Sequence, residues 1–109
     1  MSTQANIVSA VARRGYLDGW SSEELFARQV VKLAEELGEL ALAVTSDDPR
    51  LDYLLRQIST VGGMARVVFQ DRSCFVGADL DSAAAASELA DCAVVLAVAL
   101  FVSGVVAPW

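Results

Sequence analysis

Two pairs of acidic residues stand out in the sequence because each pair is spaced to act together on a helix. Glu36 and Glu39 lie in the stretch KLAEELGEL, and Glu88 and Asp91 lie in the most apolar part of the chain. Side chains three residues apart on a helix differ by about 60° in direction, so they converge. If the two helices pack side by side, four carboxylates surround one space, and their mutual repulsion requires cations there.

The expected cation is Mg²⁺, with Mn²⁺ as an alternative, because both prefer ligand sets made of oxygen atoms. Magnesium also shares its ligands with phosphates, so such a site suits the phosphate tail of a nucleotide. Glu35 could reach a metal-bound water and act as a base, or it could be a solvated charge on the helix face. Lys32 could contact phosphate or form an i,i+4 pair with Glu36.

A structural role for the acids is the main alternative. A single ExxE pattern is common on surface helices, and arginines could neutralise carboxylates that are buried in a core. Four arginines are candidates for such pairs: Arg13, Arg28, Arg56 and Arg66. Buried ion pairs are weak contributors to stability, which favours the metal site.

Composition excludes several other classes of protein. The net charge is −6 and the chain has one lysine, which disfavours binding to a nucleic-acid polymer. The absence of histidine removes the commonest zinc ligand and every Ser-His-Asp arrangement. Cys74 and Cys92 lack CxxC spacing and fit a reducing compartment, and the first residues show no signal-peptide pattern. A cytoplasmic location is therefore expected.

Apolar periodicity predicts a single all-α domain over residues 1–109, with four main helices and no strand. Ser21 and Glu24 form a capping-box pattern, Asp48 and Pro49 can start the third helix, and Gly104 can end the last one. Residues 70–80 are predicted to be a loop. The predicted helices cover about residues 3–14, 22–44, 49–69 and 81–103.

Apolar residues in the second helix fall on one stripe, which is expected to face a core. The stripe consists of Phe26, Leu33, Leu37, Leu40 and Val44. Within the third helix, Gly62 and Gly63 weaken the helix by roughly 1 kcal/mol each relative to alanine. They indicate either a close helix crossing or a kink, and the sequence leaves both open.

The second half of the last helix is apolar on all sides. A chain of 109 residues can hardly surround such a helix, so a homodimer or homotetramer is expected. The uncharged run over residues 92–107 is shorter than the roughly 20 apolar residues that span a bilayer. Extending the run toward the N-terminus meets Asp91 and Glu88, which are costly in lipid. The sequence therefore predicts a buried helix and no membrane partner.

Two segments of the chain resemble a known family. ARQVVKLAEELGELALAV followed by ASELADCAVVLAVAL is similar to the MazG-like all-α nucleoside triphosphate pyrophosphohydrolases, which include dimeric dUTPases and dCTP pyrophosphatases. Their signature is a helix with EExxE and a later helix with ExxD, and the resemblance covers roughly residues 16–100. The 48 residues between Glu39 and Glu88 exceed the spacing of compact members, so an inserted helix is expected.

The resemblance implies a four-helix core assembled from two or more subunits. It implies Mg²⁺ held by Glu36, Glu39, Glu88 and Asp91. The implied activity is hydrolysis of a (d)NTP to a nucleoside monophosphate and pyrophosphate, in house-cleaning of the nucleotide pool.

Candidate substrate-binding residues follow partly from the resemblance. Trp20 stands where relatives often place an aromatic residue near the base, although it could equally be a hydrophobic staple for the helix start. Several relatives hold phosphate with a basic or asparagine-containing segment after the ExxD helix, which is missing here. Phosphate neutralisation is therefore expected from the metal and from arginines of this chain or of a neighbouring subunit, and the candidate phosphate-binding residues are Lys32 and Arg28. The alternative functions are a non-catalytic nucleotide- or metal-binding module, a structural helix bundle and a single-span membrane protein.

Overall fold

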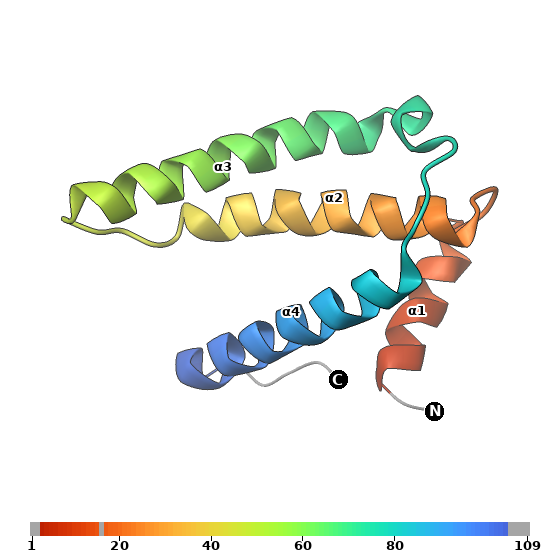
Figure 1. The fold of residues 1–109 in the computed structure, drawn as a ribbon. Helices are drawn as coiled ribbons and strands as arrows, with labels where there is room; N and C mark the ends of the chain where they lie inside the picture. Colours follow the sequence, from red (N-terminus) through yellow and green to blue (C-terminus); the bar gives the residue numbers. More distant parts are fainter. Residues whose placement is uncertain (1–2, 16, 105–109) are drawn as a thin grey trace. The chain divides into compact units, whose positions relative to one another are not determined.

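The computed structural model describes residues 3–15 and 17–104, which form four α-helices and a short 3-10 helix (Figure 1). No strand occurs in these residues, so the predicted all-α fold with four main helices is confirmed. The chain divides into two compact units, Met1–Trp20 with Leu80–Trp109 and Ser21–Asp79, which are described separately. The elements are α1 (Thr3–Arg13), α2 (Ser22–Ala41), α3 (Pro49–Gln70), η1 (Arg72–Phe75) and α4 (Ser82–Ser103).

Local capping signals set the helix starts. The Ser21 hydroxyl accepts a hydrogen bond from the Glu24 amide at 3.1 Å, and the Glu24 carboxylate accepts one from the Ser21 amide at 2.9 Å. This is the predicted capping box. At the start of α3, the Asp48 carboxylate accepts a hydrogen bond from the Arg50 amide at 2.8 Å, with Pro49 in the first turn.

The helix ends also follow local chemistry, with one correction. Gly104 ends α4 with a φ of 75°, a left-handed conformation that glycine adopts without strain. The prediction that the second helix reaches Val44 is wrong, because α2 ends at Ala41. The amides of Leu42, Ala43 and Val44 bond to carbonyls three residues back, so the last turn tightens before the polar turn at residues 45–48.

Residues 70–80 are not entirely a loop, because η1 forms within them. The Asp71 carboxylate caps η1 by accepting hydrogen bonds from the Ser73 amide at 3.0 Å and the Ser73 hydroxyl at 2.6 Å. Phe75, the last residue of η1, is only 3% exposed. The Glu24 carboxylate also accepts a hydrogen bond from the Gly77 amide at 2.8 Å. These contacts attach the segment after α3 to the start of α2.

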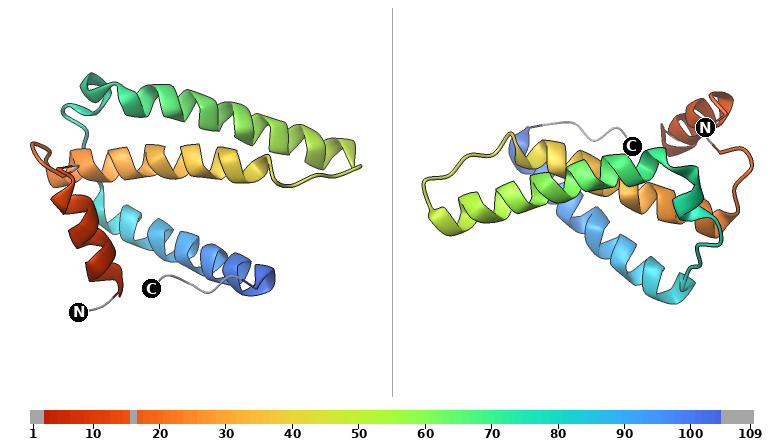
Figure 2. Two further views of the ribbon diagram at one scale, coloured as in Figure 1. Left: turned by 180° about the vertical axis from the view of Figure 1, so that it is seen from behind. Right: turned by 90° about the horizontal axis from the view of Figure 1, so that it is seen from above.

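Helices α2 and α3 form an antiparallel hairpin; the left view in Figure 2 shows them side by side, and the right view shows them crossing. They meet through small residues, because Gly38 and Ala41 of α2 and Gly62 and Ala65 of α3 are the residues that these helices bury. A Cβ built on Gly62 would lie 2.6 Å from the Gly38 Cα. The sequence left open whether the glycine pair marks a close helix crossing or a kink. Gly62 lies at a close crossing.

The predicted core stripe on α2 does not face α3. Leu33 is 54% exposed and Leu40 is 60% exposed, and Leu37 and Val44 are also exposed. At 100° per residue, Leu37 lies 100° around the helix from Gly38, so the surface that contacts α3 and the leucine stripe are different faces. Among the described residues, the buried hydrophobic side chains are Ala41, Ala65 and Phe75.

Helix α4 has 22 residues and a mean hydropathy of 2.0 in its most apolar window. None of its residues is buried. It is long and apolar enough to cross a membrane by length and composition. Helix α4 begins ten residues before the uncharged run at residues 92–107, and this additional first half contains Glu88 and Asp91.

Candidate functional site

The acidic motif of α2 surrounds one ammonium group. The Lys32 Nζ lies 3.3 Å from a Glu35 carboxylate oxygen and 3.5 Å from one of Glu36. Burial alone lowers the pKa of Lys32, but the hydrogen bond and charge of Glu35, together with the charge of Glu36, raise it overall. The i,i+4 pair between Lys32 and Glu36 is confirmed. Lys32 is therefore a permanent cation beside the two carboxylates.

The glutamates of this motif differ in their access to water. The side chain of Glu35 is 12% exposed, whereas that of Glu36 is 56% exposed. The interpretation of Glu35 as a solvated charge on the helix face is therefore wrong. Glu36 and Glu39 are exposed, as a pair that binds a ligand from solvent must be.

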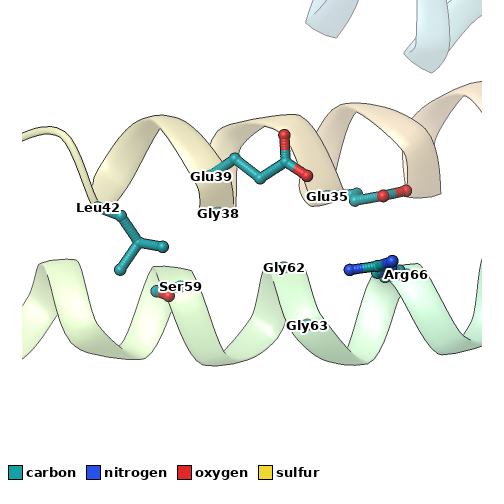
Figure 3. A pocket seen from close by; sticks show the side chains of 8 residues that line it. All are labelled: Glu35, Gly38, Glu39, Leu42, Ser59, Gly62, Gly63 and Arg66. Carbon is teal, nitrogen blue, oxygen red and sulfur yellow. The ribbon is translucent and has the colours of Figure 1, made fainter.

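A hollow of about 180 Å³ lies between α2 and α3, beside the glycine crossing (Figure 3). Glu35 and Glu39 line it from α2, and Ser59 and Arg66 line it from α3. Leu42, Gly38, Gly62 and Gly63 complete the lining. The volume is below the roughly 300–1,000 Å³ of a complete ligand pocket. It can therefore take water molecules or part of a ligand.

The two adjacent glycines of α3 have different surroundings in this hollow. A Cβ on Gly62 would also lie 3.2 Å from the Ala34 carbonyl oxygen, whereas a Cβ on Gly63 would meet nothing within 4 Å. The crossing therefore requires Gly62, and Gly63 leaves open space. The sequence pattern alone did not separate these two roles.

Arg28 and Lys32 lie over aromatic rings at the end of the hairpin. The Arg28 Cζ is 4.6 Å from the centre of the Phe69 ring and 5.9 Å from that of Phe75. The Lys32 Nζ is 5.2 Å from the centre of the Phe69 ring. The two rings pack edge to face, with centres 6.5 Å apart. Sequence reasoning missed both phenylalanines, because only the fold brings them to Arg28.

Helix α4 carries the second acidic pair. Glu88 and Asp91 are three residues apart on a regular helix, and both are exposed. They belong to a different unit from Glu36 and Glu39, so the meeting of the two pairs stays a prediction. Within each unit, the described residues hold no group of three acidic or cysteine side chains that could bind a metal ion. Each unit thus holds two of the four motif carboxylates.

The remaining residues predicted for the site have clear positions. Trp20 directly precedes the helix cap Ser21 and is half-buried. Of the arginines considered as partners of the motif acids, Arg56 binds Asp52 instead, at 3.0 Å. Arg66 lies across the hollow from the glutamates.

Comparison of the chain with models of protein families, with curated proteins and with solved structures gives no match.

Proposed function

We propose that this protein is a nucleoside triphosphate pyrophosphohydrolase that converts (d)NTPs to monophosphates and pyrophosphate. One observation carries the proposal: both acidic pairs lie within uninterrupted helices at i,i+3 spacing, and all four carboxylates are exposed. Such oxygen donors suit Mg²⁺. The residues assigned to the metal are Glu36, Glu39, Glu88 and Asp91.

The proposed site requires α2 and α4 to pack together. Leu40, at the edge of the exposed leucine stripe, lies 40° around the helix from Glu36, so a helix that covers the stripe also approaches the acids. Helix α4, from the same chain or a second copy, supplies an apolar surface together with Glu88 and Asp91. Burial of both apolar surfaces would favour this packing. Packing against α4 of a second copy would give the expected homodimer or homotetramer.

The chain's own residues have distinct tasks in the proposed reaction. Mg²⁺, when bound, would neutralise phosphate charge and make a water molecule more acidic. Glu35 accepts the proton of the attacking water, because it lies beside Glu36 and is held by Lys32 at 3.3 Å. Lys32 and Arg28 hold the phosphate tail, and Trp20 stacks on the base.

A panel of canonical and noncanonical (d)NTPs with Mg²⁺ tests this function. Pyrophosphate release is expected, and Glu36→Gln should reduce it by roughly 100-fold or more. Glu23→Gln, which removes the same charge from the first turn of α2, is the matched control and should retain activity. Release of single phosphates would contradict the proposed bond. Nucleotide binding without any turnover would favour a non-catalytic binding module.

One observation favours a second candidate, a membrane-anchored protein. The 22 residues of α4 extend over about 33 Å, close to the roughly 30 Å of a bilayer's hydrocarbon core. Against it, Glu88 and Asp91 would enter the lipid, where each acid costs up to about 3 kcal/mol. Sedimentation with phospholipid vesicles decides between the candidates. A chain that stays in the supernatant without detergent is not an anchored protein.

A further inference from the structure

Arg28, Lys32, Phe69 and Phe75 form a cluster at the end of the hairpin, which we call the cationic corner. A single ring, Phe69, lies beneath both cations, at 4.6 Å from the Arg28 Cζ and 5.2 Å from the Lys32 Nζ. The electron-rich face of an aromatic ring attracts a cation at such distances. The same ring therefore attracts a guanidinium and an ammonium group.

The aromatic platform is held by the surrounding structure. Phe75 is 3% exposed and packs edge to face on Phe69. Glu24 accepts hydrogen bonds from the amides of Ser21 and Gly77, which ties the chain after η1 to the start of α2. The two rings are thus positioned before any ligand arrives, which lowers the entropic cost of binding.

Three basic side chains gather at this corner, where Glu35 and Glu36 also contact Lys32. Of the eight basic residues in the chain, Arg28 and Lys32 lie over the Phe69 ring, and the charge of Arg72 is felt at Arg28. Burial and then the charge of Arg72 lower the pKa of the Arg28 guanidinium. A phosphate is suited to the site because guanidinium groups bind its oxygens in pairs.

The acids beside Lys32 set the direction of the ligand. Glu35 and Glu36 both contact Lys32, so an anion centred there would meet two negative charges. Arg28 lies one helical turn, about 6 Å, farther from these acids. The end of a phosphate chain is therefore best placed at Arg28, with the rest of the chain running past Lys32.

We propose that the cationic corner binds the terminal phosphate of the substrate's triphosphate tail, with Phe69 as the positioning residue that holds Arg28 and Lys32. This inference rests on the proposed function for the identity of the ligand. The binding itself needs no metal, because the cations belong to the chain. Free polyphosphate has the same chemistry as the nucleotide tail, so it provides a direct probe.

The test is calorimetric titration of the full chain with inorganic tripolyphosphate in the presence of EDTA. Saturable binding is expected, and Arg28→Gln should weaken it at least about 10-fold, as expected for loss of a charge-assisted contact. Arg56→Gln is the matched control, since it removes the same charge from an exposed pair with Asp52. This control should bind as the wild type does.

The role of Phe69 is tested with two variants. Phe69→Leu should weaken tripolyphosphate binding roughly 3- to 10-fold, whereas Phe69→Tyr, which keeps the ring, should restore it. Far-UV circular dichroism monitors folding of both. A Phe69→Leu variant that binds as the wild type does overturns the positioning role. If Phe69→Leu loses helical structure, the other two variants test the proposal. Phe69→Tyr must then bind tripolyphosphate as the wild type does, and Arg28→Gln must bind it more weakly.

The outcomes separate this inference from the proposed function. Absence of metal-free tripolyphosphate binding, or equal weakening by Arg28→Gln and Arg56→Gln, overturns the cationic corner even if pyrophosphate is released from nucleotides. Tripolyphosphate binding with the expected variants, but no pyrophosphate release with Mg²⁺, supports the corner and overturns the proposed activity. A nucleotide titration alongside shows whether the tail of a bound nucleotide uses the same residues.

Discussion

A methyl group added to Gly38 would lie 2.6 Å from the Cα of Gly62, so α2 and α3 cross where neither helix can carry a side chain. This contact brings the backbones together and forms the floor of the hollow lined by Glu35 and Glu39. Small residues at a helix crossing allow close approach, but they bury little apolar area. The crossing therefore places the motif helix precisely beside α3 without supplying a large core.

Alanine substitutions at the glycines should have opposite effects. Gly62→Ala and Gly38→Ala must separate the helices, and we expect each to lower the free energy of unfolding by about 1–3 kcal/mol. Gly63→Ala is the matched control, because its Cβ meets nothing within 4 Å. It should raise stability by up to about 1 kcal/mol through helix propensity. Urea unfolding followed by circular dichroism measures all three, and similar losses at Gly62 and Gly63 would contradict the described crossing.

The capping box should contribute to stability in a pH-dependent way. The Ser21 amide and then the Gly77 amide hold the pKa of Glu24 below its ordinary value. The ionised carboxylate thus stabilises the fold above the unfolded-state pKa, and this contribution is lost as pH falls through the folded-state pKa. The stability difference between wild type and Glu24→Gln should shrink as pH is lowered from about 6 to about 3. A difference that grows on acidification would contradict this assignment.

Removal of the Ser21 hydroxyl tests the same cap from the other side. Ser21→Ala should cost about 1 kcal/mol, because the Glu24 amide loses its acceptor. Ser22→Ala, in the adjacent first position of α2, is the control and should have a smaller effect. Thermal unfolding of both variants at neutral pH provides the comparison.

Polar substitutions in the leucine stripe should weaken self-association. Leu37 and Leu40 are 49% and 60% exposed, and the proposed function requires this surface to be covered. Leu37→Asn with Leu40→Asn should shift the protein toward the monomer in sedimentation velocity experiments, because the variants lose apolar area at the interface. Leu42→Asn, at a residue that is 70% exposed and lies off the stripe, should leave the association unchanged. A wild-type protein that is monomeric at all concentrations would remove the basis of this prediction.

The two acidic pairs should behave as one site. Glu36→Gln and Glu88→Gln are each expected to reduce pyrophosphate release by roughly 100-fold or more, since each removes charge from the metal ligands. The double variant should lose little more than either single variant, because residues that act as a unit are not additive. Fully additive losses would indicate that the α2 and α4 carboxylates act separately.

Much of the local structure was predictable because its causes lie within a few residues. The Ser21–Glu24 box, the Asp48–Pro49 start and the left-handed Gly104 end all depend on side chains that bond to a nearby backbone. The end of α2 was predicted too late, since periodicity continues through Val44 although the hydrogen bonding has already tightened. Helical spacing also put the two members of each acidic pair on one helix, and it placed Lys32 beside Glu36.

The sequence by itself determined which residues are helical and which acids share a helix face, because capping and 3.6-residue periodicity are short-range effects. Only the tertiary structure decided that Gly62 forms the crossing while Gly63 faces open space. It also decided that Glu35 is mostly buried and that Phe69 lies beneath Arg28 and Lys32. These relationships join residues more than 20 positions apart. They depend on how α3 packs against α2, which no local pattern encodes.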